Sequence, residues 1–381
     1  PWVYIEMPHR ILAHRETIVH HARRLGVALP VVPGEGQTAE LGLPEVSIVD
    51  MRQELRSGNR SIFSLKMQAA IEQVLETNQQ AILFLNRRGS ATYVFCRECG
   101  FVVKCPRDDK PLTYHQRPDR LLCHTCGYQR GVPRTCPVCG SSQIRQLGTG
   151  TEKVEQMVHE RFPSARTLRW DAETTRKKDA HERILAQFSA HQADLLIGTQ
   201  MLAKGLDLPL VTFVGVILAE VGLNLPDYRA TERTFQLLTQ VAGRAGRSPL
   251  GGRVIFQTYE PDNYAIQTAA KHDFQGFYQQ EIAYRRDLKY PPFSRLIRLE
   301  YRHYDPHKAE EAARTLAERL LHWIVKGDYR IELMGPVPCF FSKLSGRYRW
   351  QIILRGPDPT RLLRKRSLPD WIVEVDPTSL L

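Results

Sequence analysis

The chain reads Gln240-Val-Ala-Gly-Arg-Ala-Gly-Arg247 at the end of a helical pattern, and this stretch decides the fold. The apolar residues Phe235, Leu238 and Ala242 are spaced three and four apart, which predicts an amphipathic helix over 230–242. Each of the two arginines follows a glycine, and glycine favours the tight turn at which a helix ends. The arginines are therefore predicted to project from a helix end rather than from its flank.

Arg244 and Arg247 are the first candidate site residues. A guanidinium group is always charged and forked, so it suits the charge on a transferring phosphoryl group. The alternative is that both arginines are solvated at a helix C-terminus, where cations complement the helix dipole.

The strand and loop before this helix favour the phosphate interpretation. They read Asp194-Leu-Leu-Ile-Gly-Thr-Gln-Met-Leu-Ala-Lys-Gly-Leu-Asp207, a short apolar strand that breaks at Gly198 and continues as a polar loop. In open α/β sheets, ligands gather at such carboxyl ends of strands. Together the two segments resemble motifs V and VI of the superfamily-two helicases.

Composition favours a large chain with a polyanionic partner. The 381 residues predict two or three domains, and 53 Lys and Arg against 41 Asp and Glu give a net charge of +12. That excess suits nucleic acid, although an ordinary basic cytosolic protein would have it too. No apolar run approaches the length of a membrane span, so no membrane partner is expected. The first residues have neither an initiator Met nor a signal-peptide pattern, so we expect a portion of a longer chain.

Strands alternate with helices from residue 60 to 258, which predicts βαβ units around a parallel sheet, a RecA-like α/β lobe. The expected strands are 46–51, 81–86, 143–147, 166–170, 194–197, 212–218 and 253–258, and the expected helices are 64–77, 152–161, 175–189 and 230–242. Residues 1–59 are assigned to the tail of a preceding domain and a linker.

A different pattern begins after Pro261. The order β-α-β-β-α-β predicts a small α+β domain of split-βαβ type over 259–381. Its strands are expected at 296–301, 329–334, 348–354 and 372–375, preceded by a helix at 274–288 and joined by a long helix at 306–325 and a short basic one.

Seven of the eight cysteines lie in a short insertion, residues 95–142, and Cys339 lies apart. The spacings are Cys96-x-x-Cys99, Cys105-Pro-Arg-Asp108, Cys123-x-x-Cys126 and Cys136-x-x-Cys139. Two residues between thiolates let both reach one tetrahedral ion, and two such knuckles close a structural zinc site. Each complete knuckle is followed by a glycine that permits its turn: Gly100, Gly127 and Gly140. Metal in a reducing compartment is therefore favoured over disulfides.

An eighth ligand is missing at Asp108. Carboxylate oxygen and imidazole nitrogen both bind zinc, so Asp108, Asp109, His115 or His124 could complete a mixed site. The alternative is a weak or vacant second site. We expect one intact site and one impaired one. A further interpretation is that zinc only stabilises the fold of this small insertion.

These features together resemble the primosomal protein N′ (PriA) family of bacterial replication-restart helicases, over nearly the whole chain. The matching segments are Phe84-Leu-Asn-Arg-Arg-Gly89, the cysteine array with Pro133-Arg-Thr-Cys-Pro-Val-Cys-Gly140, Gly148-Thr-Gly-Thr-Glu152, Gly198-Thr-Gln-Met-Leu-Ala-Lys-Gly205, Gln240–Arg247, Leu288-Lys-Tyr-Pro-Pro-Phe293, Gly335-Pro-Val-Pro338, Gly346-Arg-Tyr-Arg-Trp-Gln351 and Val375-Asp-Pro377.

The resemblance implies a set of residue roles. Zinc ligands would pair in a nested way, Cys96, Cys99, Cys136 and Cys139 around one ion and Cys105, Cys123 and Cys126, with Asp108 where the family has cysteine, around the other. Arg247 would be the arginine finger on ATP, Arg244 would support it, and Gln240 would couple the nucleotide to lobe closure. Single-stranded DNA would contact Thr199, Gln200, Lys204, Arg87 and Arg88, and Arg347 and Gln351 would bind the tail of single-strand-binding protein. Branched DNA and other primosome proteins are the further partners implied, in the bacterial cytoplasm at the nucleoid.

Two family motifs have no match in this sequence. A Gly-x-x-x-x-Gly-Lys-Ser/Thr loop and an acidic magnesium motif lie in the family's first helicase lobe, so ATP and Mg²⁺ would bind mainly there. We therefore expect a complete protein that is an ATP-dependent 3′-to-5′ DNA helicase, and a chain that is inactive alone. Gly148-Thr-Gly-Thr-Glu-Lys153 is the alternative phosphate loop, but its spacing differs from the Walker pattern. A motor-less fork-binding and partner-recruiting module, or a zinc-ribbon RNA-binding protein, are the competing functions.

Overall fold

The computed structural model describes residues 23, 26, 43–86, 92–107, 110–116, 119–146, 150–175, 179–200, 208, 210–245, 252–364 and 366–381. The chain divides into two compact units. The first comprises Pro1–Gly89, Thr149–Gly222 and Arg233–Phe277, and the second comprises Ser90–Gly148, Leu223–Glu232 and Tyr278–Leu381. Among the described residues, no helix combines the length and apolarity that crossing a membrane requires.

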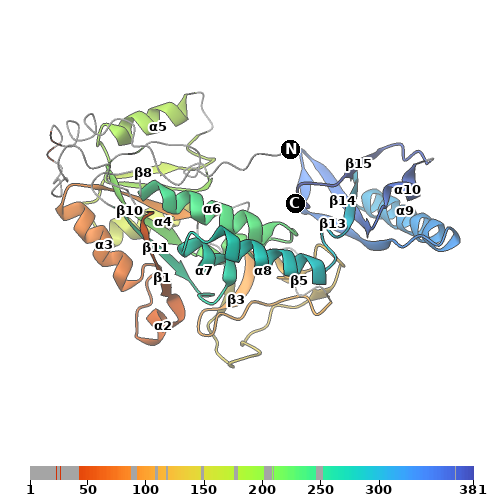
Figure 1. Ribbon diagram of the computed structural model, residues 1–381, viewed down its shortest axis with the longest axis horizontal. Coiled ribbons are helices and arrows are strands. Elements are labelled where there is room, and N and C mark those ends of the chain that lie inside the picture. Colours follow the sequence, from red (N-terminus) through yellow and green to blue (C-terminus); the bar gives the residue numbers. More distant parts are fainter. Residues whose placement is uncertain are drawn as a thin grey trace. The chain divides into compact units, whose positions relative to one another are not determined.

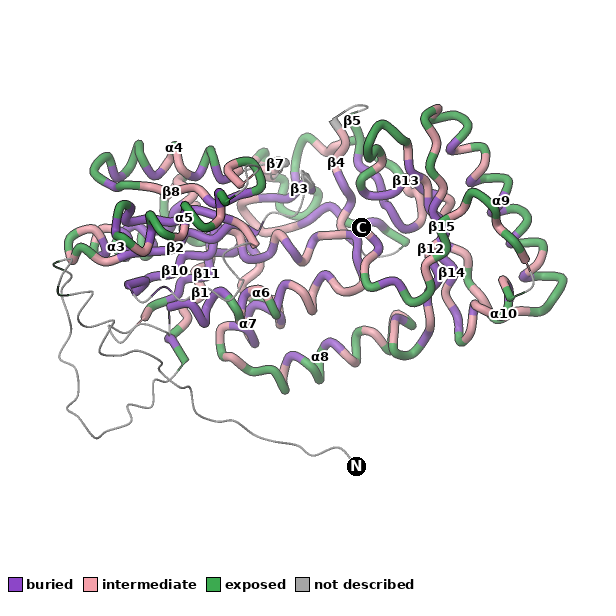
Figure 2. The backbone as a smooth tube through the Cα atoms, turned by 90° about the horizontal axis from the view of Figure 1, so that it is seen from above, coloured by how far each residue is buried: buried purple, intermediate pink, exposed green. Residues whose placement is uncertain are grey.

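A six-stranded parallel sheet forms the centre of the first unit (Figure 1). Its spatial order is β1 (Glu45–Asp50), β11 (Arg253–Thr258), β10 (Val211–Ile217), β2 (Gln80–Leu85), β9 (Leu195–Gly198) and β8 (Thr167–Trp170). The apolar runs predicted as buried strands occupy its middle, and every residue of β2, β9 and β10 is buried (Figure 2). Edge strand β1 falls inside the segment assigned to a tail and linker, yet it pairs with β11 in register.

Helices cover both faces of this sheet, as βαβ connections require. The described helices of the unit are α2 (Met51–Arg56), α3 (Leu65–Glu76), α4 (Thr151–Arg161), α5 (Ala180–Ser189), η2 (Ala219–Gly222), most of α6 (Ala230–Ala245), α7 (Tyr264–Ala270) and the start of α8 (Phe274–Asp287). Apolar side chains of α3 and α4 pack on one face, where Met67, Ile71, Val154 and Val158 join strand residues in one core cluster. Figures 1 and 2 place α6 and α7 on the opposite face. The layered arrangement confirms the predicted α/β lobe.

Helix α6 differs from its prediction at one end. It continues through Gly243 to Ala245, so Gly243 does not end it. Residues 241–245 are all buried, and tertiary packing of this last turn outweighs the modest helix cost of one glycine.

The C-terminal domain in the second unit is a four-stranded antiparallel sheet with helices on one face (Figure 1). The chain order is β12 (Arg295–His303), α9 (Pro306–Lys326), β13 (Glu332–Leu344), β14 (Arg347–Gly356), α10 (Thr360–Leu363) and β15 (Trp371–Val375), and the spatial order is β13-β14-β12-β15. This is the predicted split-βαβ arrangement, with β13 longer than expected. Leu316, Leu320 and Ile324 of α9 pack on β12 and β14.

The cysteine-rich segment forms its own five-stranded sheet in the same unit. Its spatial order is β6 (Gln129–Arg130), β5 (Asp119–Leu122), β4 (Thr113–Gln116), β3 (Thr92–Cys96) and β7 (Ile144–Gln146). A small cluster of Val94, Val103, Leu112 and Leu121 is its core, together with Cys105 and Cys123. A core this small rarely folds without a metal or other support.

Candidate zinc centres and helicase motifs

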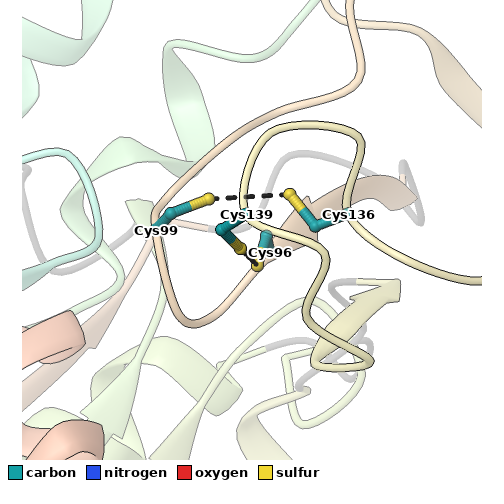
Figure 3. Close-up of side chains that lie close together, drawn as sticks. All are labelled: Cys96, Cys99, Cys136 and Cys139. Carbon is teal, nitrogen blue, oxygen red and sulfur yellow. Dashed lines mark hydrogen bonds between the residues drawn. The ribbon is translucent and has the colours of Figure 1, made fainter.

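Four thiols converge in the first cysteine cluster. Cys96, Cys99, Cys136 and Cys139 hold their sulfur atoms within 4.8 Å of one another, and two chain segments present them face to face (Figure 3). Sγ of Cys96 lies 3.7 Å from that of Cys139, and Sγ of Cys99 lies 3.6 Å from that of Cys136. Thiolates around zinc at the usual bond length are about 3.8 Å apart, the edge of a tetrahedron. The residues therefore fit a structural zinc site with four cysteine ligands.

Each knuckle turns at the glycine that follows it. The N–H groups of Gly100, Gly127 and Gly140 donate to the carbonyls of the first cysteines of their knuckles at 2.9, 3.0 and 2.9 Å. All three glycines have φ between +72° and +79°, which only glycine adopts readily. The predicted reason for these glycines is confirmed. All eight cysteines lie among the described residues, and none forms a disulfide.

The knuckle backbone prepares one ligand for a cation. Burial raises the pKa of Cys136, but the N–H groups of Cys139 and Val138 and neighbouring thiols lower it to about 7. Burial raises the pKa of Cys99 to about 12. Four neighbouring sulfurs cannot all ionise without a cation, so a metal ion is what allows the cluster to be tetrathiolate.

The second cluster contains three thiols. Cys105, Cys123 and Cys126 lie within 4.8 Å of one another, with 3.5 Å between Sγ of Cys105 and Sγ of Cys126. This is the pairing that the family resemblance implied. Asp108 and Asp109, candidates for the fourth ligand, lie outside the described residues. Within the described part, the cluster is a three-ligand site to which another ligand or water would add.

The two histidines proposed as ligands have other partners. Nε2 of His115 and Nε2 of His124 are 3.0 Å apart, and Nδ1 of His124 lies 2.9 Å from the carbonyl oxygen of Pro338. A carbonyl only accepts, so Nδ1 of His124 donates, and its Nε2 accepts from His115. Burial lowers the pKa of His124 to about 4, which keeps the ring neutral and suited to this pattern.

His124 fastens its knuckle to the C-terminal domain. Its ring meets Phe340 edge-on at 5.6 Å, and its carbonyl accepts from Nε2 of Gln351 at 3.4 Å. A Cβ added at Gly127 would lie 3.3 Å from Cγ1 of Val337. Sequence reasoning considered His124 only as a metal ligand, because its partners are more than 200 residues away along the chain.

The two described motif V residues after β9 lie at the carboxyl edge of the parallel sheet, as predicted. Thr199 and Gln200 directly follow β9, and Nε2 of Gln200 donates to Oδ1 of Asn86 at 3.4 Å. Asn86 follows β2, the neighbouring strand, and is buried at 2 % exposure. Lys204, Arg87 and Arg88 lie outside the described residues.

The motif VI residues are partly described. Gln240 is exposed on α6, and Arg244 lies one turn later in the last turn, buried at 7 % exposure. Arg244 therefore lies within the last turn of α6 and is not a solvated side chain, which was the alternative interpretation of this arginine. Arg247 lies outside the described residues.

Of the two residues predicted to bind a peptide tail, Arg347 is exposed and Gln351 is buried. Arg347 is exposed, and its guanidinium lies over the ring of Tyr304 at 4.9 Å. Gln351 is 2 % exposed and lies against His124 and Cys339. Arg349 lies between them on β14, and it forms an ion pair with Glu300 of β12 that the sequence did not predict. There the buried Arg349 binds Glu300 through two bonds of 2.7 and 2.8 Å.

Three protein-family models match consecutive parts of the chain. The model described as "PriA DNA helicase Cys-rich region (CRR) domain" matches residues 105–130, and "Helicase conserved C-terminal domain" matches residues 141–249. "Primosomal protein N C-terminal domain" matches residues 286–378. The helicase match confirms the RecA-like lobe, and the cysteine-rich match together with the thiol clusters supports zinc binding.

Curated relatives match nearly the whole chain. Replication restart protein PriA of Bacillus subtilis is 45 % identical over 337 residues, covering 88 % of this chain and 41 % of the relative. That of Synechocystis is 42 % identical over 353 residues, covering 89 % of this chain and 42 % of the relative. The chain thus spans about two fifths of these relatives. Among solved structures, S. cerevisiae Dbp5 bound to RNA and ADP BeF3 covers 65 % of this chain and 45 % of its own, at 11 % identity and a TM-score of 0.29, too low to carry an argument.

Proposed function

This chain is a relative of the C-terminal portion of the PriA replication restart proteins, and from that premise we propose that it forms the second motor lobe and the partner-binding part of an ATP-dependent 3′-to-5′ DNA helicase. The complete protein recognises stalled or branched forks and starts primosome assembly. The observation that carries the proposal is the joint placement of two motifs on one parallel-sheet lobe: Gln200 at the carboxyl edge and Gln240 and Arg244 on α6.

Helix α6 and the arginines of motif VI complete a cleft, and the first lobe of the complete protein holds the nucleotide on the other side of it. ATP and Mg²⁺ bind mainly to the first lobe of the complete protein, and Arg247 stabilises the charge on the γ-phosphate. Buried Arg244 supports the end of α6, and exposed Gln240 senses the nucleotide. Placing charge by rigid elements is what makes such stabilisation effective.

DNA is held without sequence readout. Thr199 and Gln200, with Lys204, Arg87 and Arg88, offer hydroxyl, amide and cationic groups, which bind phosphates of any sequence. Lobe closure on ATP then moves the strand stepwise.

Zinc supports the partner-binding half. Cys96, Cys99, Cys136 and Cys139 would hold one ion, which supplies a structural crosslink rather than chemistry. Cys105, Cys123 and Cys126, with Asp108, would hold a second, weaker one. The C-terminal domain, with Arg347 exposed, serves the tail of single-strand-binding protein, branched DNA and other primosome proteins, in the bacterial cytoplasm at the nucleoid.

The test compares arginine variants in the complete gene product that contains this chain. We expect Arg247→Ala to lower the DNA-stimulated kcat for ATP by roughly 10³–10⁵-fold. Arg253→Ala is the matched control, because that exposed side chain bonds Gln73, away from both motifs, and its kcat should be unchanged. The polypeptide of 381 residues alone should hydrolyse negligible ATP. Full activity of Arg247→Ala, or vigorous ATP hydrolysis by the isolated chain, would overturn the assignment.

A further inference from the structure

A buried carboxamide lies beside the motif V residue Gln200 at the carboxyl edge of the six-stranded sheet. We propose that Asn86 is a positioning residue for the DNA contact: it holds the side chain of Gln200, and Gly222 leaves the room that its amide group needs. All three residues belong to the first unit. The inference rests on the proposed function, in which Gln200 contacts the phosphates of single-stranded DNA.

The register of two neighbouring strands brings Asn86 and Gln200 together. Strands β2 and β9 are parallel, and Phe84 of β2 pairs with Gly198 of β9. Asn86 and Gln200 each come two residues after that pair, so they lie side by side where the chain leaves the sheet. There Nε2 of Gln200 donates to Oδ1 of Asn86 at 3.4 Å. Gln200 is half-buried and Asn86 is buried, so a DNA strand can reach the first residue and not the second.

The same carboxamide carries an unpaired donor. Nδ2 of Asn86 is buried and has no hydrogen-bond partner among the described residues. Buried amide donors are almost always paired, and an apolar side chain of the same shape would avoid the cost of an unpaired one. Asn86 is therefore a poor choice for the stability of the sheet edge. What it offers over an apolar residue is the Oδ1 acceptor, and that acceptor binds Gln200.

A glycine makes room for this carboxamide. Gly222 ends the short helix η2, which follows β10, and β10 and β9 flank β2 on its two sides. A Cβ added at Gly222 would lie 2.3 Å from Nδ2 of Asn86 and 2.4 Å from Oγ1 of Thr234 on α6. Both distances are shorter than real Cβ contacts, so a larger residue at this position would push both side-chain ends aside.

The glycine is itself held by the neighbouring strand. Glu220 of η2 is 1 % exposed, and its Oε1 accepts from the N–H of Tyr259, directly after β11, at 3.2 Å. Thr234 is also buried. Buried groups of η2 and α6 therefore enclose the amide of Asn86. A side chain enclosed in this way keeps one orientation, so it presents its acceptor to Gln200 in one place, as a precise contact requires.

A purely structural role for Asn86 predicts a different outcome. If the carboxamide only stabilised the sheet edge, an apolar replacement would lower the melting temperature, and DNA binding would fall only with the fraction of folded protein. If it positions Gln200, the replacement leaves the melting temperature unchanged or raises it, and the affinity for DNA falls. The effect also requires Gln200, so it should vanish in a protein that already lacks this side chain.

The experiment measures binding of single-stranded oligo(dT) to the complete gene product by fluorescence anisotropy, together with thermal unfolding. Asn86→Leu removes the carboxamide at nearly constant volume, and it is made alone and together with Gln200→Ala. Gln80→Leu is the matched control. Gln80 is also buried, and it lies at the opposite end of β2, where its Nε2 donates to the carbonyls of Phe188 and Ala193 at 2.7 and 2.8 Å.

A pair of glycine variants tests the steric part of the inference. Gly222→Ala leaves every polar group in place and displaces the amide of Asn86. Gly215→Ala is its control, because a Cβ at Gly215 meets the flexible end of Met67 at 2.9 Å in the middle of β10, away from the carboxyl edge. Gly222→Ala should weaken oligo(dT) binding about as much as Asn86→Leu does. Gly215→Ala should lower the melting temperature without changing the Kd of the folded protein.

We expect Asn86→Leu to raise the Kd for oligo(dT) roughly 3- to 10-fold at an unchanged or higher melting temperature, because one hydrogen-bonded contact to DNA is misplaced. Gln80→Leu should lower the melting temperature and leave the Kd of the folded protein unchanged. The double variant should bind no more weakly than Gln200→Ala alone.

An unchanged Kd in Asn86→Leu and Gly222→Ala, an equal rise in Gln80→Leu, or a further loss of affinity in the double variant would each refute the positioning role. If Gln200→Ala itself leaves the Kd unchanged, the proposed DNA contact fails and the inference fails with it. If Gln200→Ala weakens binding and Asn86→Leu does not, only the inference fails.

Discussion

The two cysteine clusters are built from the same knuckle and are held in place differently. In the first, four thiols converge and Cys139 is exposed, so its stability depends on its own ligands. In the second, three thiols converge, and His124, one of the two residues between the cysteines of its complete knuckle, is bonded to Pro338 of the C-terminal domain. We therefore infer that a bound metal ion would stabilise the first cluster, and that packing on the C-terminal domain supplies much of the stability of the second.

If the second site is impaired, as the sequence predicts, this difference shows how it can persist. Zinc-ribbon folds have little core of their own, and ligand loss normally unfolds them. Here the ring of His124 against Phe340 and the bond from Gln351 replace part of what a fourth ligand would supply. We infer that packing of His124 against the C-terminal domain makes the second site less dependent on a fourth metal ligand.

The largest expected effect comes from removing a ligand of each cluster. The unaltered chain should hold between about one and two zinc ions. Cys136→Ser should remove about one ion and unfold the ribbon, because structural zinc contributes on the order of 10 kcal/mol to such folds. Cys105→Ser should remove less zinc and leave the ribbon docked. Elemental analysis with thermal unfolding measures both.

The control is Cys339→Ala, since that buried thiol belongs to neither cluster and donates to Gln351 within the C-terminal domain. Its zinc content should equal that of the unaltered chain. Equal zinc loss and equal destabilisation by Cys136→Ser and Cys105→Ser would erase the distinction between the clusters.

The features of the site that the sequence could predict are those that residues close together in the chain determine. Cysteine spacing and the following glycine fix a knuckle within five residues, and the positive φ of Gly100 and Gly140 follows from that turn alone. The apolar runs that became β2 and β10 are local in the same sense. Motif V fell at the carboxyl edge of the sheet because a parallel strand order dictates that edge.

The remainder depends on partners distant in sequence. His124 meets a carbonyl 214 residues away, and Asp227 meets Ser379 across 152 residues. Neither shows any local signal beyond a polar residue in a polar segment. Helix α6 passed Gly243 for the same reason, because burial of its last turn is a tertiary effect.

An intermediate effect is expected at the histidine contact itself. His124→Ala leaves the carbonyl of Pro338 without its donor and removes the contact with Phe340, at a cost of roughly 2–4 kcal/mol in the free energy of unfolding. His115→Ala removes only the bond between the two rings and should cost about 1 kcal/mol. Denaturant unfolding of both variants measures the difference. Equal costs would mean that the contact with the C-terminal domain contributes nothing.

The smallest effect compares two glycines with the same backbone and different neighbours. Gly127 and Gly140 have φ of +77° and +72°, so alanine at either costs about 1 kcal/mol in backbone strain. A Cβ at Gly140 meets nothing within 4 Å, whereas one at Gly127 meets Val337 at 3.3 Å. That contact is tight enough to push β13 away by a few tenths of an ångström. Gly127→Ala should therefore lose several tenths of a kcal/mol more than Gly140→Ala, because packed interfaces respond to even one methyl group. If the ribbon were not seated on the C-terminal domain, the two substitutions would cost the same, and parallel denaturant titrations of both variants decide the point.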